Sequence, residues 1–202
     1  SYIYSGLVKS TLSNGQIQFN VPQAGVFDTS STSNKEVYTN VGLPFIYDSS
    51  TGYYTFDAGS DGYGVHFNDL DGDNVIETAE KKSGVNLVLD QPFTAYDSIN
   101  ENNKVGFFPF NCYGGTSSDA VYHFGMNTVI NFTMTEDGTV NGNNGDPITF
   151  EFAGDDDVWV FIDGQLVLDL GGIHDSVSAK IDFKENQITM WSTDNKYGSG
   201  DN

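Results

Sequence analysis

The sequence contains no arginine, one cysteine and no long apolar run. Without guanidinium groups it lacks the usual bidentate clamp for carboxylate or phosphate ligands. Eight lysines stand against 28 acidic residues, and the net charge of −20 argues against a nucleic-acid partner, because phosphate neutralisation supplies most of that affinity. No stretch is long enough to span a bilayer, and the N-terminus shows no signal-peptide pattern. We therefore expect neutral ligands or cations, and no direct membrane insertion.

The lone cysteine, Cys112, excludes an intramolecular disulfide framework. In a secreted protein we interpret this as favouring a bacterial surface protein that uses metal in place of disulfides, over a eukaryotic extracellular module. Any signal, anchor or neighbouring repeat would then lie outside this segment. We expect the protein to be secreted or attached to the bacterial cell wall through such regions.

The length of 202 residues fits one domain, 1–202, with a sizeable core. Abundant glycine, tyrosine and phenylalanine predict many short strands joined by turns. Apolar residues alternate with polar ones in several stretches, as in Ile130, Phe132 and Met134. The predicted fold is all-β, an antiparallel sandwich or barrel, with strands near residues 3–9, 16–20, 45–47, 53–56, 65–67, 85–89, 105–110, 129–134, 148–152, 158–162, 165–170, 177–183 and 187–191.

One glycosylation sequon, Asn131-Phe132-Thr133, falls inside the predicted strand 129–134. Because an asparagine within a strand is a poor acceptor position, we interpret this match as a coincidence.

The stretch that organises the chain is Gly154–His174, GDDDVWVFIDGQLVLDLGGIH. Its Asp-Gly pair, residues 163 and 164, is a hairpin turn signal between two apolar strands. Adjacent carboxylates at the start of this hairpin repel one another unless a positive charge lies among them. Hard, closely spaced oxygen ligands suit Ca²⁺ better than a transition metal. We predict a calcium ion held by Asp155, Asp156 and Asp157; the alternative is a solvated acidic turn.

A second acidic stretch, 69–80 (DLDGDNVIETAE), follows the spacing of an EF-hand loop. Asn74 stands where glycine is usual, and asparagine tolerates the left-handed conformation required there. Glycines on both sides make helical flanks improbable, so we predict a structural ion in an EF-hand-like loop inserted between strands. The alternative is an acidic turn with unrelated carboxylates. The predicted ligands are Asp69, Asp71, Asp73, the Val75 carbonyl, Glu77 and Glu80.

The hairpin sequence resembles the signature of bacterial fibro-slime domains, a branch of the protective-antigen-type β-sandwich superfamily. The stretches 123–127 (HFGMN) and 147–152 (PITFEF) also resemble that branch, so the resemblance covers roughly the second half of the chain. It implies a further closing segment, and hence a chain truncated before its last strand or strands. It also implies two consecutive aspartates joined by a cis peptide, whose Ca²⁺ ligates sugar hydroxyls. The matching pair is Asp155-Asp156, with Asp156-Asp157 as the alternative.

The same resemblance implies that a later loop completes the ligand site. Candidates for its asparagine and carbonyl ligands are Asp194, Asn195 and Asn202. His174 borders the same pocket or is a hydrogen-bonded structural histidine, since imidazole is a poor calcium ligand. An aromatic side chain would stack on the sugar, the candidates being Trp191, Tyr113 and Trp159, although core packing is the competing interpretation of Trp159.

The function expected from these features is calcium-dependent binding of a neutral extracellular glycan or glycoprotein, in adhesion at a bacterial cell surface. The alternative is a structural or assembly domain of a surface appendage or matrix protein, in contact with other domains of a larger protein, in which calcium only stabilises the fold. Asp156 and Asp163 would be a carboxylate pair for glycoside hydrolysis, but nothing distinguishes an acid from a base. No nucleophile triad, zinc signature or phosphate-binding glycine loop is present. We therefore expect no enzyme activity.

Overall fold

The structure is a computed structural model. Its described residues contain ten strands and no helix, and hence no helix that could cross a membrane. They group into two compact units, the first built from residues 1–28 and 126–202 and the second from residues 29–125. The structure describes residues 3–21, 27, 35, 37–39, 41–43, 45–56, 64–67, 87–90, 106–107, 124–140, 145–172 and 174–192.

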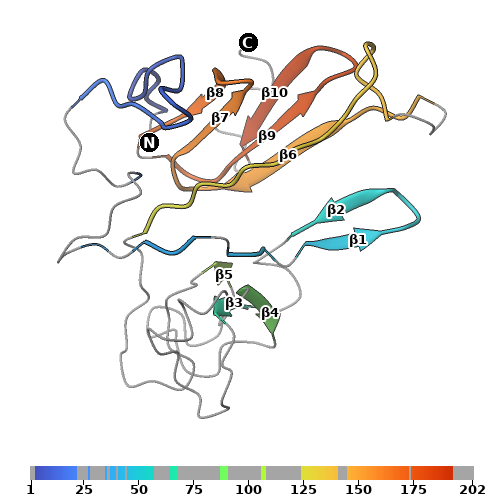
Figure 1. The fold of residues 1–202 in the computed structure, drawn as a ribbon, viewed down its shortest axis with the longest axis horizontal. Helices are drawn as coiled ribbons and strands as arrows, with labels where there is room; N and C mark the ends of the chain where they lie inside the picture. Colours follow the sequence, from blue (N-terminus) through green and yellow to red (C-terminus); the bar gives the residue numbers. More distant parts are fainter. Residues whose placement is uncertain are drawn as a thin grey trace. The chain divides into compact units, whose positions relative to one another are not determined.

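The first unit contains a three-stranded antiparallel sheet and a hairpin (Figure 1). The sheet has the order β10-β9-β6, with β6 at Thr149–Gly154, β9 at Val177–Asp182 and β10 at Gln187–Ser192. The hairpin pairs β7 (Val158–Ile162) with β8 (Gln165–Leu170). Its turn residues have φ values of 49° at Asp163 and 78° at Gly164, which confirms the predicted Asp-Gly turn.

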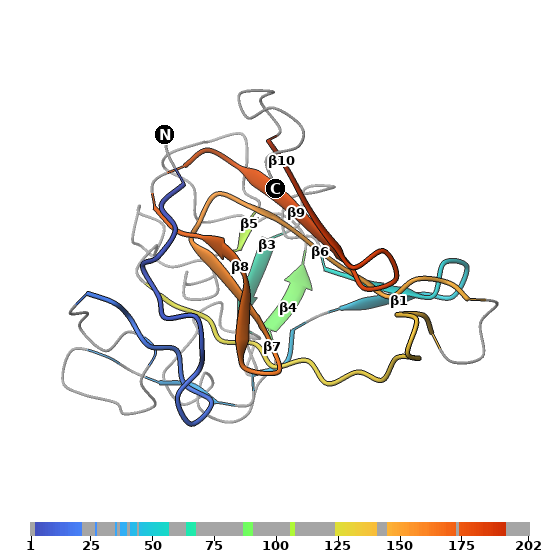
Figure 2. The same cartoon turned by 90° about the horizontal axis from the view of Figure 1, so that it is seen from above.

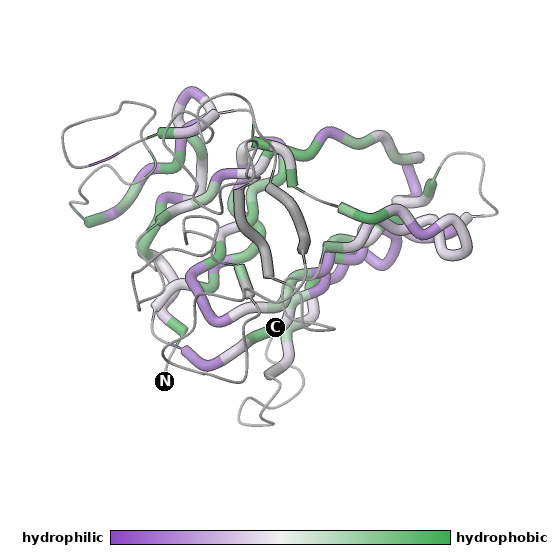
Figure 3. The backbone as a smooth tube through the Cα atoms, turned by 90° about the horizontal axis from the view of Figure 1, so that it is seen from below, coloured by the Kyte–Doolittle hydropathy of each residue, from purple (hydrophilic) through white to green (hydrophobic). Residues whose placement is uncertain are grey.

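The core of this unit joins the hairpin to the sheet. Alternation along β8 turns Leu168 and Leu170 toward β9, where Val177 and Ala179 meet them, and all four side chains are buried. Burying each leucine contributes about 1.5–3 kcal/mol to stability. The hydropathy along the chain is drawn in Figure 3. Partly buried side chains around this core are Ile3, Phe152, Val158, Val160, Ile188 and Met190.

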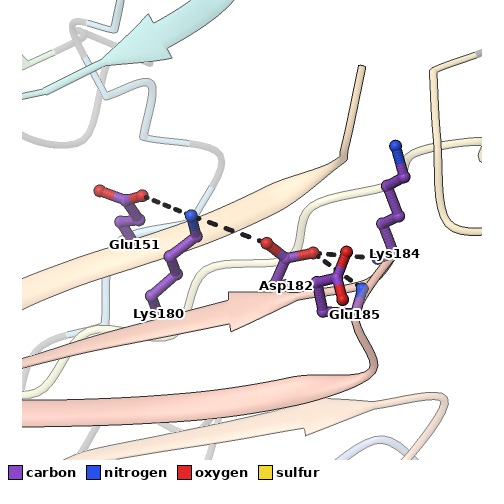
Figure 4. Close-up of polar contacts among 5 residues, drawn as sticks. All are labelled: Glu151, Lys180, Asp182, Lys184 and Glu185. Carbon is purple, nitrogen blue, oxygen red and sulfur yellow. Dashed lines mark hydrogen bonds and ion pairs between the residues drawn. The ribbon is translucent and has the colours of Figure 1, made fainter. Parts of the chain in front are cut away.

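Polar side chains occupy the opposite face of the sheet (Figure 4). The Nζ of Lys180 lies 3.8 Å from Glu151 Oε1 and 3.7 Å from Asp182 Oδ2. The other oxygen of Asp182 accepts hydrogen bonds from the backbone N–H groups of Lys184 (3.1 Å) and Glu185 (3.0 Å) in the turn between β9 and β10. Ion pairs this long on a surface contribute about 0–1 kcal/mol. This face is therefore a solvated face of the sheet.

The N-terminal segment, residues 3–21, lies along the free edge of β8 (Figure 2). The Tyr4 N–H donates to the Gly171 carbonyl at 2.6 Å, and the Leu166 N–H donates to the Ser10 carbonyl at 2.8 Å. The pairing consists of isolated bridges, so the predicted strands 3–9 and 16–20 are not regular strands. The segment nevertheless covers the hydrogen-bonding edge that β8 would otherwise expose.

The predicted strand 129–134 is wrong, because residues 124–134 form no strand. Val129 is 78% exposed and Ile130 is 55% exposed. Alternation gives the potential for a strand, but a strand forms only where a partner supplies the backbone bonds. The ring of Phe132 packs 5.1 Å from that of Phe183, which fixes the middle of this stretch against the turn between β9 and β10.

The described residues of the second unit form five short strands. A hairpin joins β1 (Ile46–Asp48) to β2 (Tyr53–Thr55), and Tyr47 packs 4.9 Å from Tyr54 across it. A separate sheet has the order β4-β3-β5, in which β3 and β5 run parallel. All residues of β1 and β2 are exposed. The bounds of the other strands are Gly64–Phe67 for β3, Leu87–Asp90 for β4 and Gly106–Phe107 for β5.

The strand-rich, mainly antiparallel character of the fold is confirmed. The prediction of a single domain concerns how the two units pack together and stays a prediction. The predicted calcium loop, 69–80, lies outside the described residues.

Candidate functional site

The three adjacent aspartates form the turn between β6 and β7. Asp155, Asp156 and Asp157 are all exposed there. Every peptide bond that the structure describes is trans, so the cis bond expected at Asp155-Asp156 is absent. The trans form is the default for residues other than proline, by about 3–4 kcal/mol.

Asp157 has the most distinctive electrostatics of this turn. Partial burial raises the pKa of its carboxyl group, and the nearby carboxylates of Asp156 and Asp169 raise it further. A hydrogen bond from the Gly172 backbone and the proximity of His174 oppose this rise. The ionised form of Asp157 is therefore disfavoured by its surroundings, and two residues after β8 partly compensate.

His174 follows β8 and is buried, with 7% of its surface exposed. Its Nδ1 lies 2.9 Å from the Asp175 carbonyl oxygen. Because a carbonyl only accepts, Nδ1 carries a proton in that bond. Nε2 is buried without a hydrogen-bond partner among the described residues. The ring thus belongs to the interior of the unit.

Asp169 connects three parts of the first unit, and the sequence analysis missed it. Its Oδ1 accepts a hydrogen bond from Trp159 Nε1 at 2.9 Å, and its Oδ2 accepts one from the Gly6 backbone N–H at 2.6 Å. Trp159 lies directly opposite on β7 in the hairpin register. The two carboxylate oxygens therefore hold the tryptophan and the N-terminal segment against β8 through hydrogen bonds.

Aromatic rings complete this face of the hairpin. The ring of Trp159 meets Phe19 edge-on at 5.7 Å and Phe27 edge-on at 6.4 Å, and the two phenylalanines stack at 6.0 Å. The three rings pack against one another, which supports the core-packing interpretation of Trp159. Trp191, on β10, is 39% exposed.

The described residues contain no group of three or more His, Cys, Asp or Glu side chains placed to hold a metal ion. The other ligands expected for calcium at the turn Asp155–Asp157 were to come from a later loop, so calcium at this turn stays a prediction. Predicted site residues outside the described ranges are Asp69, Asp71, Asp73, Val75, Glu77, Glu80, Tyr113, Asp194, Asn195 and Asn202.

Comparison with known proteins shows relatives in the eukaryote Dictyostelium discoideum. The chain is 36% identical to protein psiG over 110 residues, which are 48% of this chain and 14% of psiG. It is 35% identical to protein psiB over 125 residues, 54% of this chain and 20% of psiB. A shorter match to protein psiP is 50% identical over 52 residues, 26% of this chain and 6% of psiP. Each match thus covers at most a fifth of the relative's own length. No family model and no solved structure matches the chain.

These relatives correct the expectations that depended on the bacterial resemblance. The relatives are eukaryotic psi proteins, so the assignment to bacterial fibro-slime adhesins is wrong. Calcium-dependent glycan binding in bacterial adhesion is overturned with it, and so is a bacterial surface appendage or matrix as the setting of its alternative. The hairpin motif misled because an Asp-Gly turn between apolar strands is a general signal of a hairpin, and fold does not imply function.

The argument from cysteine was also wrong. A single cysteine does not by itself disfavour a eukaryotic source, since the relatives come from a eukaryote. Disulfides are needed chiefly by small domains that cannot bury enough apolar surface. A chain of 202 residues with a packed core is not under that constraint.

Proposed function

We propose that the chain is a non-catalytic β-sandwich module of a larger exported protein, whose partners are other domains of that protein. The observation that carries this proposal is the use made of Asp169. Its two oxygens accept hydrogen bonds from Trp159 Nε1 and from the Gly6 backbone N–H, so this carboxylate holds the tryptophan and the N-terminal segment against β8. The best-defined polar group on the hairpin therefore has a structural role.

The modular part of the proposal is supported by the extent of the matches. The aligned segments make up 14% of psiG and 20% of psiB, so similar sequence forms a small part of much longer chains. The core built from β8 and β9 supports a sandwich, because the apolar side of the hairpin packs on the apolar side of the three-stranded sheet.

We also propose that a structural Ca²⁺ binds the loop Asp69–Glu80. The support is the spacing of its carboxylates in the sequence. A loop of this kind is compatible with export, since EF-hand loops serve extracellular modules as well as cytosolic proteins.

The test is to express residues 1–202 behind a heterologous secretion leader in a eukaryotic cell. We expect folded protein in the medium, with one cooperative unfolding transition followed by circular dichroism. Retention and degradation inside the cell, or unfolding without cooperativity, would contradict an exported module. Purified protein that turns over a glycoside or ester substrate would contradict the non-catalytic assignment.

A further inference from the structure

We propose that Asn131 is an N-glycosylation site; the inference rests on the proposed export. Asn131, Phe132 and Thr133 form the only Asn-x-Ser/Thr sequon in the sequence, and the central residue is not proline. The sequence alone places this sequon in a strand, where a sugar would interfere with pairing. The structure places it elsewhere: residues 124–134 form no strand, and Asn131 and Thr133 are both exposed.

The local contacts leave the acceptor accessible. Phe132 is the residue of the sequon that contacts the rest of the unit: its ring lies 5.1 Å from that of Phe183, while 49% of its surface stays exposed. Neither the Asn131 amide nor the Thr133 hydroxyl makes a hydrogen bond to any described residue. The fold thus anchors the middle of the sequon and leaves both functional side chains toward solvent. A glycan attached at Asn131 is compatible with the folded unit.

The donor is a lipid-pyrophosphate-linked oligosaccharide supplied by the secretory pathway. The amide nitrogen of Asn131 attacks C1 of the first sugar, forming an N–C bond. The bond between C1 and the phosphate oxygen breaks, and the lipid pyrophosphate leaves with the bonding electron pair. The nitrogen loses one proton to the base of the transferase. The Thr133 hydroxyl is the group at the third sequon position that this recognition requires.

A glycan here has a physical consequence for the module. The stretch around Asn131 carries large apolar side chains at high exposure, namely Met126 (50%), Val129 (78%), Ile130 (55%), Phe132 (49%) and Met134 (45%). Contiguous exposed apolar surface promotes association. A hydrophilic glycan attached in the middle of this stretch would cover it, so its removal should increase aggregation of the secreted protein.

The test uses the secretion experiment with four variants. Asn131→Gln removes the acceptor, Thr133→Ala removes the hydroxyl, Thr133→Ser keeps it, and Asn127→Gln is a nearby asparagine outside any sequon. Secreted protein is treated with peptide-N-glycosidase in heavy-oxygen water, and the labelled aspartate is located by peptide mass spectrometry.

We expect wild type, Thr133→Ser and Asn127→Gln to carry one glycan at residue 131, and Asn131→Gln and Thr133→Ala to carry none and to aggregate more. Secreted wild type with an unmodified Asn131 would overturn the inference while leaving the export proposal intact. Retention and degradation of wild type and all variants alike would instead count against export.

Discussion

Replacing Asp169 with alanine should loosen the N-terminal segment from the hairpin. The side chain accepts bonds from Trp159 Nε1 at 2.9 Å and from the Gly6 N–H at 2.6 Å. Hydrogen bonds to a charged group contribute about 1.5–3 kcal/mol each. The Gly6 end is exposed, so water replaces much of that bond, and we expect a total loss of about 2–3 kcal/mol. For a chain of this size that corresponds to a fall in Tm of about 5–10 °C.

The assay is thermal unfolding followed by circular dichroism and tryptophan fluorescence. Asp169→Asn keeps one carbonyl oxygen for Trp159 and should lose about 1 kcal/mol. The matched control is Asp163→Asn in the hairpin turn, where φ is 49° and asparagine tolerates that conformation; its stability should change by less than about 0.5 kcal/mol.

A double-mutant cycle separates this interaction from general damage. Trp159→Phe removes the indole N–H but keeps a ring for Phe19 and Phe27 to pack on. Combined with Asp169→Ala, its effect should be non-additive by about 0.5–1.5 kcal/mol. A Tm for Asp169→Ala equal to that of wild type, or higher, would refute the structural role, because residues kept for function rather than stability often raise stability when replaced.

Three further predictions concern other parts of the chain. Gly138→Ala should lower the free energy of unfolding by about 2 kcal/mol or more, because φ is 72° and an added Cβ would overlap the Phe183 carbonyl. Gly145→Ala is the control: φ is 76° but the space around it is open, so the loss should be about 1 kcal/mol. Equal Tm losses for the two variants would contradict this. Calcium at a hundredfold excess over its Kd should stabilise the folded protein by about 2.7 kcal/mol, and Asp71→Asn should reduce that gain. A Tm that does not change with calcium would contradict calcium binding by the loop Asp69–Glu80. With calcium chelated, the raised pKa of Asp157 means that its stabilising contribution is present below the ordinary value of 3.8 and is lost as pH rises through the folded value. Asp157→Asn should therefore unfold at a higher temperature than wild type at neutral pH, with the difference vanishing in acid; a constant difference across pH would rule this out.

Local patterns in the sequence were sufficient for the strands of the first unit. The hairpin strands 158–162 and 165–170 and the Asp-Gly turn are confirmed to the residue. The alternation at 177–183 and 187–191 also predicted β9 and β10 within one residue. These elements carry their turn signals and apolar alternation within a few residues, so short-range sequence is enough.

Which distant segments pair with each other could not be predicted from these local patterns. Residues 129–134 alternate as cleanly as β9 does, yet they form no strand, because alternation does not specify a partner. The pairing of residues 3–21 with β8 likewise depends on contacts more than 150 positions apart in the chain. Alternation therefore predicted strand potential at 129–134 and at residues 3–9, but not which stretch found a partner.

The sequence by itself determined that the hairpin exists, where it turns and that it would be apolar. A two-residue turn at Asp163-Gly164, continued without interruption, would place Trp159 opposite Leu168. The structure has a bulge between Val160 and Phe161, which shifts the register and places Trp159 opposite Asp169. One extra residue changes the face to which every later side chain points. In this bulged register Leu168 and Leu170 pack in the core with Val177 and Ala179 of β9, and Asp169 accepts the hydrogen bond of Trp159; these tertiary contacts lie outside what a local turn pattern specifies.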